Sequence, residues 1–417
     1  METRRQDLPP GWHYDDDTGA IMRDVIHRMG RRCFKWNYYS KGVYMITMTL
    51  ADRSKHLFGR LVGDSAETAA IELSELGRAV DSHLRRISEF TSEIEILGAQ
   101  LMPEHLHTVL RAKRRMAKPL GIALRGFKGG ASQLFWRLAP PEKTRRWHGE
   151  RTNGDGERTN GERNAERKPL FAEGYVDNIL GDEQAVESAL RYLADNPRRL
   201  WEKRAHPELF KVLREARVRL DVGKASATAS AGAPAVPTAG FFAAIGNLAL
   251  LDAPNIFQVQ CSRSFFEYRR ASDGSLLKDA PPAVETREFI EKRDGFLEAA
   301  EHGAVLISPC ISHGEREIAR HAFEKGLKVV TLANKGFNPL YKPGGRLFDQ
   351  CADGNLLMLA PAAWPYLPGE KKMTRVDACV LNRIAQWLSG AGAVEIKYRG
   401  AEPHQIDRLA REALKAE

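Results

Sequence analysis

The hydrophobic and polar positions in the first half of the chain follow two different periods. Residues Val43 to Leu50 mix β-branched and apolar side chains and predict a β-strand. Residues Ser65 to Ile87 place apolar positions at helical spacing and predict an α-helix. The runs Glu93 to Pro103 and His105 to Ala112 predict two strands joined by a tight turn at residues 102–104. This order of elements is typical of an α+β domain.

Two further helices are predicted in the same half. Residues Leu120 to Leu138 form a basic amphipathic pattern with aromatic residues at its end. Residues Asp182 to Pro197 form a second helical pattern, with Asp182 placed to cap its first turn. Because proline has no amide hydrogen and clashes with the preceding turn, we expect this helix to end at Pro197.

The second half of the chain alternates short apolar runs with helical patterns. Residues Ile256 to Ser262, Ala304 to Cys310, Lys328 to Asn334 and Leu356 to Pro361 are typical of buried parallel strands. Residues Gly314 to Leu327 predict the helix between the second and third of these strands. The pattern predicts a doubly wound, Rossmann-like α/β sheet, so the chain as a whole belongs to the α/β class.

Two segments lack the apolar periodicity that a folded element needs. The stretch from about Glu142 to Lys168 contains a short tandem repeat of Gly, Asn, Arg and Glu, which we interpret as a flexible surface insertion. Residues Lys224 to Gly240 are rich in Ala, Ser, Pro and Gly, a composition typical of interdomain linkers. The sequence therefore predicts a first domain at 1–215, a linker at 216–240, a Rossmann-like domain at 241–400 and a C-terminal tail helix at 401–417.

Composition limits the function classes. The 417-residue chain has a formal net charge of +9, which favours a polyanionic partner such as nucleic acid, because each Lys or Arg near a phosphate releases a counterion. Its five cysteines form no Cys-x-x-Cys pair, which argues against a disulfide framework and a zinc knuckle. No signal peptide and no membrane-spanning run is recognised. We expect a cytoplasmic, nucleoid-associated protein without membrane contact.

His105 and His107 are the first candidate site residues. They flank Leu106 on a predicted strand, where the period of two points both imidazoles to the same face. Two imidazoles on one face can chelate a divalent cation. The alternative is a pair of half-exposed strand histidines without a ligand, and the two residues alone do not separate these readings.

Tyr192 and Asn196 are spaced i and i+4, so they lie on one face of their predicted helix. A tyrosine hydroxyl can attack a phosphodiester and form a covalent phosphotyrosine, which conserves the energy needed to rejoin the strand. A cation would help by polarising the phosphate, and Asn196 can supply an amide oxygen as a third ligand. Two imidazoles with one oxygen donor suit Mg²⁺ or Mn²⁺. Alternatively, Tyr192 is a core aromatic residue and Asn196 a helix C-cap.

Several ordered motifs resemble one family. They are Leu-Met-Pro-Glu-His-Leu-His at Leu101 to His107, Gly-Phe-Lys at Gly126 to Lys128, and Arg-Tyr-Leu-Ala-Asp-Asn-Pro-Arg-Arg-Leu at Arg191 to Leu200. Residues Tyr44 to Asp64 resemble the first strand and following loop of the same group. Together these motifs resemble the REP-associated tyrosine transposases, a branch of the single-tyrosine HUH transposases, over about Val43 to Phe210.

The resemblance implies a role for each candidate residue. In such enzymes two histidines and a polar residue one turn after the tyrosine hold the metal, which implies His105, His107 and Asn196 as ligands and Tyr192 as nucleophile. It also implies a ferredoxin-like fold and single-stranded or hairpin DNA as partner. Tyr175 is a rival nucleophile, but apolar Ile179 occupies its i+4 position. Basic residues interleaved with aromatics predict DNA contacts. They are Arg125, Lys128, Arg198, Arg199, Lys203 and Arg204.

The second domain has a looser resemblance. Its pattern is similar to the DNA-processing-A (Smf) and SLOG group of Rossmann-like proteins, which bind single-stranded DNA or nucleotides. Residues Tyr341 to Gly354 place a Gly-Gly turn where backbone amides can meet a phosphate, although a turn without a ligand is an equal alternative. Neither a Gly-x-Gly-x-x-Gly motif nor a Walker lysine is present. Residues expected near the ligand cleft of such a fold are Ser308, Ser312, His313 and Glu315.

The leading hypothesis is a Mg²⁺- or Mn²⁺-dependent transposase that nicks single-stranded DNA through a 5′-phosphotyrosine and rejoins it. One alternative is a retired transposase that binds DNA as a regulator. Another is a protein that senses a nucleotide through its second domain. The sequence does not determine the DNA target or the oligomeric state, and a dimer is compatible with it.

Overall fold

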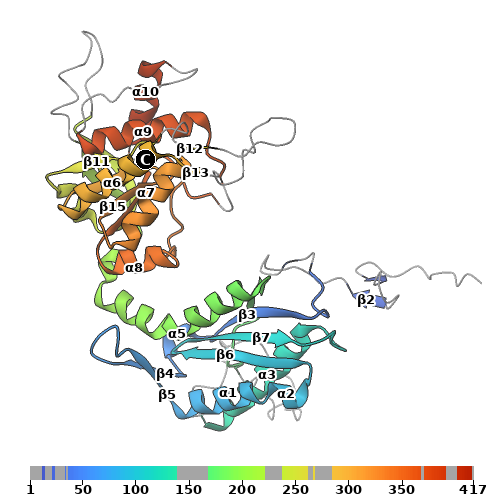
Figure 1. The fold of residues 1–417 in the computed structure, drawn as a ribbon. Coiled ribbons are helices and arrows are strands. Elements are labelled where there is room, and N and C mark those ends of the chain that lie inside the picture. Colours follow the sequence, from blue (N-terminus) through green and yellow to red (C-terminus); the bar gives the residue numbers. More distant parts are fainter. Residues whose placement is uncertain are drawn as a thin grey trace, which may run out of the picture. The chain divides into compact units, whose positions relative to one another are not determined.

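The computed structural model describes residues 12–14, 21–23, 33, 36–138, 168–220, 237–261, 266–267, 284–367, 371–390 and 402–415. The chain divides into two compact units, Met1–Trp201 and Glu202–Glu417. Apart from Lys168, the predicted insertion lies outside the described residues. Figure 1 shows a sheet in each unit with helices packed against it.

The first unit contains a four-stranded antiparallel sheet, helices on both of its faces and separate two-stranded hairpins. Its elements, in chain order, are β1 (Trp12–Tyr14), β2 (Ile21–Arg23), β3 (Gly42–Thr49), η1 (Arg53–Lys55), β4 (Gly59–Val62), β5 (Ala70–Leu73), α1 (Glu75–Arg85), α2 (Ile87–Phe90), β6 (Ile94–Met102), β7 (His105–Ala112), α3 (Leu120–Leu138), β8 (Val176–Leu180) and α5 (Glu183–Ala205).

The strand order of this sheet is β6-β7-β3-β8, and every neighbouring pair is antiparallel. Along the chain, β3, α1, β6, β7, α3 and β8 make a βαββαβ sequence, with the first strand placed beside the third and the fourth. That topology is the ferredoxin-like arrangement expected from the sequence. The tight turn at residues 102–104 is also confirmed, because β6 ends at Met102 and β7 begins at His105.

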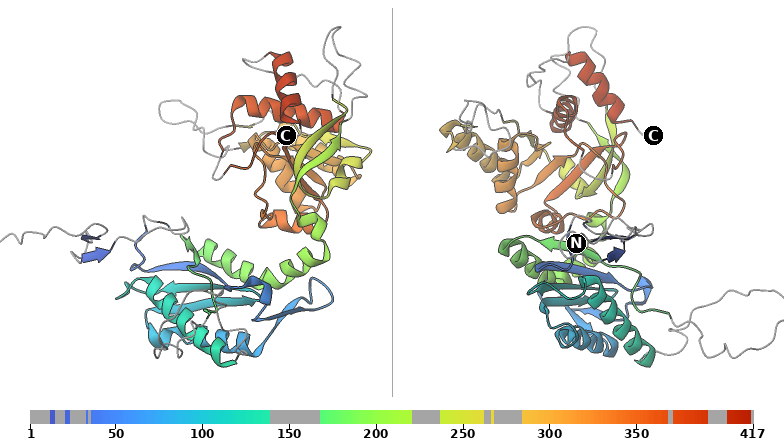
Figure 2. Two further views of the ribbon diagram at one scale, coloured as in Figure 1. Left: turned by 180° about the vertical axis from the view of Figure 1, so that it is seen from behind. Right: turned by 90° about the vertical axis from the view of Figure 1, so that its right-hand side faces the viewer.

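The two faces of the sheet carry different helices. On one face, Tyr44, Ile46 and Met48 of β3 pack with α1 and α3 in the main core of the unit. On the other face, Val43 and Met45 pack with α5 in a smaller cluster. The views from front and side agree that α5 lies opposite α1 and α3 (Figures 1 and 2). The period of two along each strand therefore decides which side chains α5 covers.

Three features differ from the sequence prediction. The predicted helix from Ser65 begins only at Glu75, because Ala70–Leu73 pairs with β4 as a hairpin and the Ser74 hydroxyl caps the amide of Gly77. Helix α5 does not end at Pro197 but continues to Ala205. Strand β8, which pairs with β3, was not predicted.

The second unit is built on a six-stranded sheet. Its elements are η3 (Pro207–Phe210), β9 (Leu213–Arg219), β10 (Ala239–Gly246), η5 (Leu248–Asp252), β11 (Ile256–Gln258), β12 (Phe266–Glu267), β13 (Val284–Glu285), α6 (Arg287–Glu301), β14 (Val305–Ser308), α7 (His313–Glu324), β15 (Val329–Leu332), α8 (Arg346–Ala352), β16 (Leu356–Pro361), α9 (Arg375–Ser389) and α10 (Pro403–Ala413).

The sheet order is β11-β14-β15-β16-β10-β9, and the first four strands are parallel. Val305 and Ile307 face a core shared with α9 and α10, whereas Leu306 faces a core shared with α6 and α7. Helices therefore cover both faces, as the near-continuous apolar strands require. The predicted doubly wound α/β sheet is confirmed, with two antiparallel strands added at one edge.

The predicted linker and the predicted tail helix both overlap elements of the second unit. Residues 213–219 form β9, which pairs with β10, so the start of the predicted linker belongs to the second sheet. Residues 221–236 lie outside the described residues. Ile406 and Ala410 of α10 are buried in the core with α9, so this helix is part of the unit. In the described part of the chain, no helix has the length and apolar character needed to cross a membrane.

Candidate functional site

The two candidate histidines lie on β7, on the face of the sheet that α5 covers. His107 pairs with Thr47 of β3, and His105 pairs with Thr49. His107 is buried, with 7% of its surface exposed, whereas His105 is half-buried. The strand therefore places one imidazole under α5 and the other closer to solvent.

The two imidazole rings converge through their Nε2 atoms, which are 3.1 Å apart. The Nδ1 atom of His107 is 2.8 Å from the hydroxyl of Thr47, and the Nδ1 atom of His105 is 3.2 Å from a carboxylate oxygen of Glu104. An ionised carboxylate only accepts, so His105 donates from Nδ1, and the Thr47 oxygen can accept from His107 in the same way. In these tautomers both Nε2 lone pairs point toward the same place.

Glu104 and Thr47 were not among the residues selected from the sequence. The hydrogen bond to His105 lowers the pKa of Glu104, although partial burial of the carboxyl opposes this shift. Glu104 thus stays ionised and holds the His105 ring. Its position directly before His105 was visible in the sequence, whereas the Thr47 contact depends on strand register.

Helix α5 brings Tyr192 and Asn196 to the same face of the sheet. The Tyr192 ring meets the His107 ring edge-on, with 5.5 Å between their centroids. Asn196 is buried, with 7% exposed, and its side-chain amide donates to the carbonyl oxygen of Tyr192 over 2.8 Å. That bond uses the NH₂ group of Asn196 within the helix, so Oδ1 is the acceptor atom that the side chain has left to offer. The helix continues beyond this point, so Asn196 is not a C-cap.

Positive charge lies beside Tyr192. The guanidinium of Arg199 stands 5.4 Å from the centre of the Tyr192 ring. Arg198 and Arg199 both form ion pairs with Asp195, with N–O distances of 2.5 and 2.8 Å. Asp195 therefore pairs with both guanidinium groups beside the tyrosine.

The six residues predicted to contact DNA fall into three places. Arg198 and Arg199 lie at the Tyr192 site, and Lys203 and Arg204 lie on the last turn of α5. Arg125 and Lys128 lie on α3, on the opposite face of the sheet. The Lys128 ammonium donates to the carbonyl oxygens of Ala172 and Gly174, so this side chain is engaged in contacts within the unit. Arg125 is exposed.

Tyr175 lies away from the histidines. It is 6% exposed and belongs to the core on the α1 and α3 face of the sheet. The sheet separates it from His105 and His107, so its hydroxyl does not reach the site that Tyr192 faces.

The donor atoms fit a divalent cation. Two ligands held about 2.1 Å from a cation and about 90° apart are separated by roughly 3.0 Å, close to the 3.1 Å between the two Nε2 atoms. In the described part of the chain, no three His, Cys, Asp or Glu side chains form a group able to hold a metal ion. Asn196 on α5 carries an amide oxygen, a donor type outside that set, and its role as a third ligand stays a prediction.

In the second unit, Ser308 and Glu315 form hydrogen bonds at the loop between β14 and α7. The Glu315 carboxylate accepts from the amide of Ile311 over 2.7 Å and from the Ser308 hydroxyl over 3.3 Å. Burial raises the pKa of Glu315, and these hydrogen bonds oppose the shift. Ser312 caps α7 by accepting from the Glu315 amide. All of these contacts stabilise the loop itself.

The other predicted residues of this unit are also held by internal contacts. The His313 ring meets the Phe266 ring edge-on at 5.1 Å. In the Tyr341 to Gly354 segment, the Lys342 ammonium donates to the carbonyl of Phe210 over 2.6 Å. These contacts assign no ligand to the second unit, and its resemblance to the DNA-processing-A group stays a prediction.

Comparison with known proteins gives distant similarities. No family model matches the chain. An uncharacterised protein of Haemophilus influenzae is 25% identical over 184 residues, which cover 43% of this chain and 92% of that protein. A solved REP-associated tyrosine transposase bound to a REP hairpin is 11% identical, with a TM-score of 0.26, over 40% of this chain and 72% of its own. A candidate transposase from Deinococcus radiodurans is 13% identical, with a TM-score of 0.22, over 39% and 95%. The TM-scores of these two solved structures are too low to support a conclusion about the site.

Proposed function

We propose that the first unit is a metal-dependent transposase domain that nicks single-stranded DNA and rejoins it through Tyr192. The observation that supports this most directly is the pair of imidazole Nε2 atoms, 3.1 Å apart, together with the Tyr192 ring, whose centroid is 5.5 Å from that of the His107 ring. Two acceptor lone pairs that face each other repel unless a proton or a cation lies between them. A cation-binding pair next to a hydroxyl nucleophile suits transfer of a phosphodiester.

The proposed reaction exchanges one phosphodiester bond for another. The Tyr192 Oη attacks the phosphorus, the Oη–P bond forms, and the bond from phosphorus to the 3′ oxygen breaks. The phenolic proton leaves to solvent, and the departing 3′ oxygen takes up a proton. The product is a 5′-phosphotyrosine with a free 3′ hydroxyl. Attack by a 3′ hydroxyl on that phosphotyrosine reverses the exchange and rejoins DNA.

The residues around Tyr192 have separate roles in this exchange. His105, His107 and Asn196 would hold Mg²⁺ or Mn²⁺, which supplies charge neutralisation to the phosphate when bound. Glu104 and Thr47 fix the orientation of the two imidazoles. Arg199 supplies positive charge beside the nucleophile.

The proposal is tested by trapping the covalent intermediate. The protein is incubated with labelled single-stranded DNA hairpins and Mn²⁺, and adducts that survive SDS are counted. We expect an adduct with the wild type and with Tyr175→Phe, and none with Tyr192→Phe. His105→Ala should abolish the adduct while DNA binding is retained. An adduct that survives Tyr192→Phe contradicts the proposal.

The same experiment tests the alternative hypothesis that the protein is a retired transposase, which binds DNA without cutting it. Hairpin DNA bound with sequence preference, but never linked covalently under any divalent cation, would indicate a DNA-binding regulator. The site geometry favours the enzyme, because both Nδ1 atoms have hydrogen-bond partners that leave the two Nε2 atoms facing each other.

A further inference from the structure

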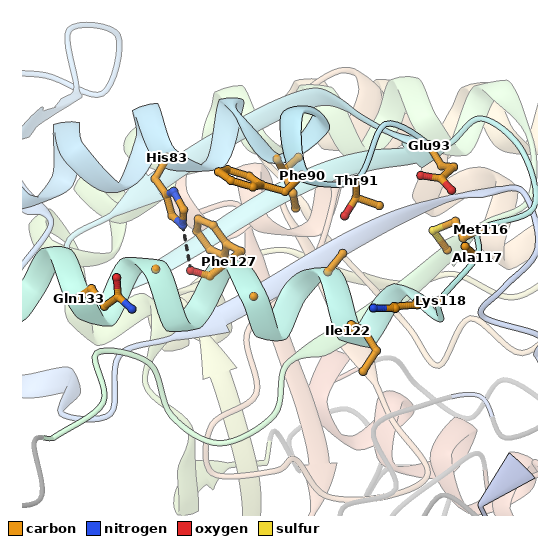
Figure 3. A pocket seen from close by; sticks show the side chains of 14 residues that line it. His83, Phe90, Thr91, Glu93, Met116, Ala117, Lys118, Ile122, Phe127 and Gln133 are labelled. Carbon is orange, nitrogen blue, oxygen red and sulfur yellow. Dashed lines mark hydrogen bonds between the residues drawn. The ribbon is translucent and has the colours of Figure 1, made fainter.

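The face of the first unit opposite Tyr192 carries a pocket that the proposed chemistry does not use. It has a volume of about 630 Å³ and lies between α2 and the end of α1 on one side and α3 on the other. We call it the α2–α3 pocket. Figure 3 shows His83 and Phe90 on one wall and Ile122, Phe127 and Gln133 on the α3 wall. A volume of this size is typical of ligand sites.

The aromatic wall of the pocket is unusually accessible. The Phe90 side chain is 72% exposed, although phenylalanine is among the residues most often buried. Behind it, the His83 ring stacks on Phe127 with 5.3 Å between centroids, and its Nε2 atom lies 3.3 Å from the Phe127 carbonyl oxygen. The pocket wall therefore presents the exposed Phe90 ring in front of the stacked rings of His83 and Phe127.

Glycines keep the α3 side of the pocket open. Gly126 and Gly130 both line the pocket, and both are positions within α3 rather than at its ends. A Cβ atom on Gly130 would lie 2.3 Å from the His83 ring, so packing explains that glycine. A Cβ atom on Gly126 would meet nothing within 4 Å. Glycine inside a helix costs stability relative to alanine, and packing gives no reason for this one. The pocket is therefore open beside Gly126.

Positive charge borders the pocket. The loop between β7 and α3 carries four exposed cations within six residues, and Lys118 itself lines the pocket. The members of this basic loop are Lys113, Arg114, Arg115 and Lys118. Arg114 interacts with Glu93, which also lines the pocket, so one carboxylate partly offsets the charge. The loop remains strongly positive and suits a phosphate backbone.

The pocket is also lined by polar side chains that can form hydrogen bonds with a base. Gln133 offers both amide donors and an acceptor, Thr91 offers a hydroxyl, and the Glu93 carboxylate accepts from amino groups. An accessible aromatic ring combined with a basic border is the arrangement by which proteins stack and hold unpaired bases. A purely apolar ligand would make no use of these polar groups or of the basic loop.

We propose that the α2–α3 pocket binds an unpaired base of single-stranded DNA, which stacks on Phe90 while the basic loop holds the adjoining phosphates. This inference rests on the proposed function for the identity of the nucleic acid. The pocket lies near the end of β7 at Ala112. That end is about five residues, or roughly 17 Å, along the strand from His107, and the pocket is on the other face of the sheet. It therefore binds a nucleotide well away from the one that Tyr192 attacks.

The test fills the pocket without disturbing the fold. Gly126→Leu places a side chain in the open volume, and Gly129→Leu is the matched control, because Gly129 is also in α3 with nothing within 4 Å but does not line the pocket. Both substitutions remove a helix glycine, so neither should lower the thermal stability. Binding of a labelled single-stranded oligonucleotide is measured by fluorescence anisotropy in EDTA, which prevents cleavage.

We expect Gly126→Leu to weaken binding about tenfold or more, since loss of one base stack typically costs on the order of 5- to 150-fold. Its salt dependence should stay unchanged, whereas Arg115→Gln should reduce the salt slope by about 0.7. A single abasic nucleotide at the bound position should weaken the wild type but not Gly126→Leu. Equal affinities for Gly126→Leu and Gly129→Leu would overturn the inference.

The two proposals fail separately. If the wild type forms the Tyr192 adduct and Gly126→Leu binds DNA like Gly129→Leu, the pocket has no role in binding and the chemistry stands. If no adduct forms while Gly126→Leu still loses affinity and the abasic effect, the pocket binds a base and the proposed chemistry is wrong.

Discussion

The hydrogen bond between Thr47 and His107 gives a sharp prediction about metal affinity. Thr47→Val keeps the shape of the side chain and removes the oxygen that lies 2.8 Å from His107 Nδ1. Without this acceptor, the His107 proton is no longer held on Nδ1, and the tautomer with a blocked Nε2 becomes accessible. The variant should therefore bind Mn²⁺ more weakly while keeping the fold.

The size of the effect follows from the contact that is lost. A hydrogen bond of this kind contributes about 0.5–1.5 kcal/mol net, which corresponds to roughly 2- to 12-fold in affinity. Removing a group that orients a ligating histidine typically costs about 10- to 100-fold. We expect the affinity for Mn²⁺ to fall about tenfold in Thr47→Val. The yield of adduct at saturating Mn²⁺ should return close to that of the wild type.

The assay is a Mn²⁺ titration followed by the electron paramagnetic resonance signal of free Mn²⁺, with the adduct yield measured in parallel. Thr49→Val is the matched control, because it makes the same substitution on the same strand face, at the position paired with His105. It should titrate like the wild type. A Thr47→Val protein with unchanged Mn²⁺ affinity would refute the role given to His107.

Three further predictions concern stability and packing. Lys128→Met removes two hydrogen bonds to backbone carbonyls and should lower the free energy of unfolding by about 1.5–3 kcal/mol in urea denaturation, whereas exposed Arg125→Met should leave it within about 0.5 kcal/mol. Burial lowers the pKa of His83, so the unfolded chain binds a proton at His83 below about pH 6.5 before the folded protein does, and stability falls as the pH drops. His83→Gln should lose less stability than the wild type between pH 7.5 and pH 5, and an equal loss would exclude His83 as the source. Gly98→Val should lower both stability and adduct yield, because even a Cβ atom there would come within 2.6 Å of Leu190 on α5; unchanged adduct formation would show that α5 need not sit this close to β6.

The sequence predicted the placement of the histidines because a strand has a strict period of two. Once β7 is a strand, His105 and His107 must share a face, and the turn at residues 102–104 was recognisable from its residues. The same reasoning did not predict Thr47 as a partner of His107. That contact depends on the pairing of two strands 60 residues apart, and register is fixed by the whole buried face.

The errors have physical reasons too. Proline is expected to stop α5, yet Leu193, Asn196 and Pro197 itself are all buried, and tertiary packing outweighs the local cost of the proline. Ala70–Leu73 has a composition compatible with helix, and only its pairing with β4 makes it a strand. The separation of Arg125 and Lys128 from Tyr192 required knowing which face of the sheet α3 covers.

The central claim is tested most directly by locating the covalent bond. The adduct formed with Mn²⁺ and a single-stranded hairpin is digested with nuclease and trypsin and analysed by tandem mass spectrometry. Trypsin cleaves after Arg191 and Arg198, so the peptide Tyr192 to Arg198 should carry the 5′-phosphate and its nucleotide on the tyrosine oxygen. A nucleotide found on any other residue, or recovered on no peptide of the wild-type protein, would contradict the account.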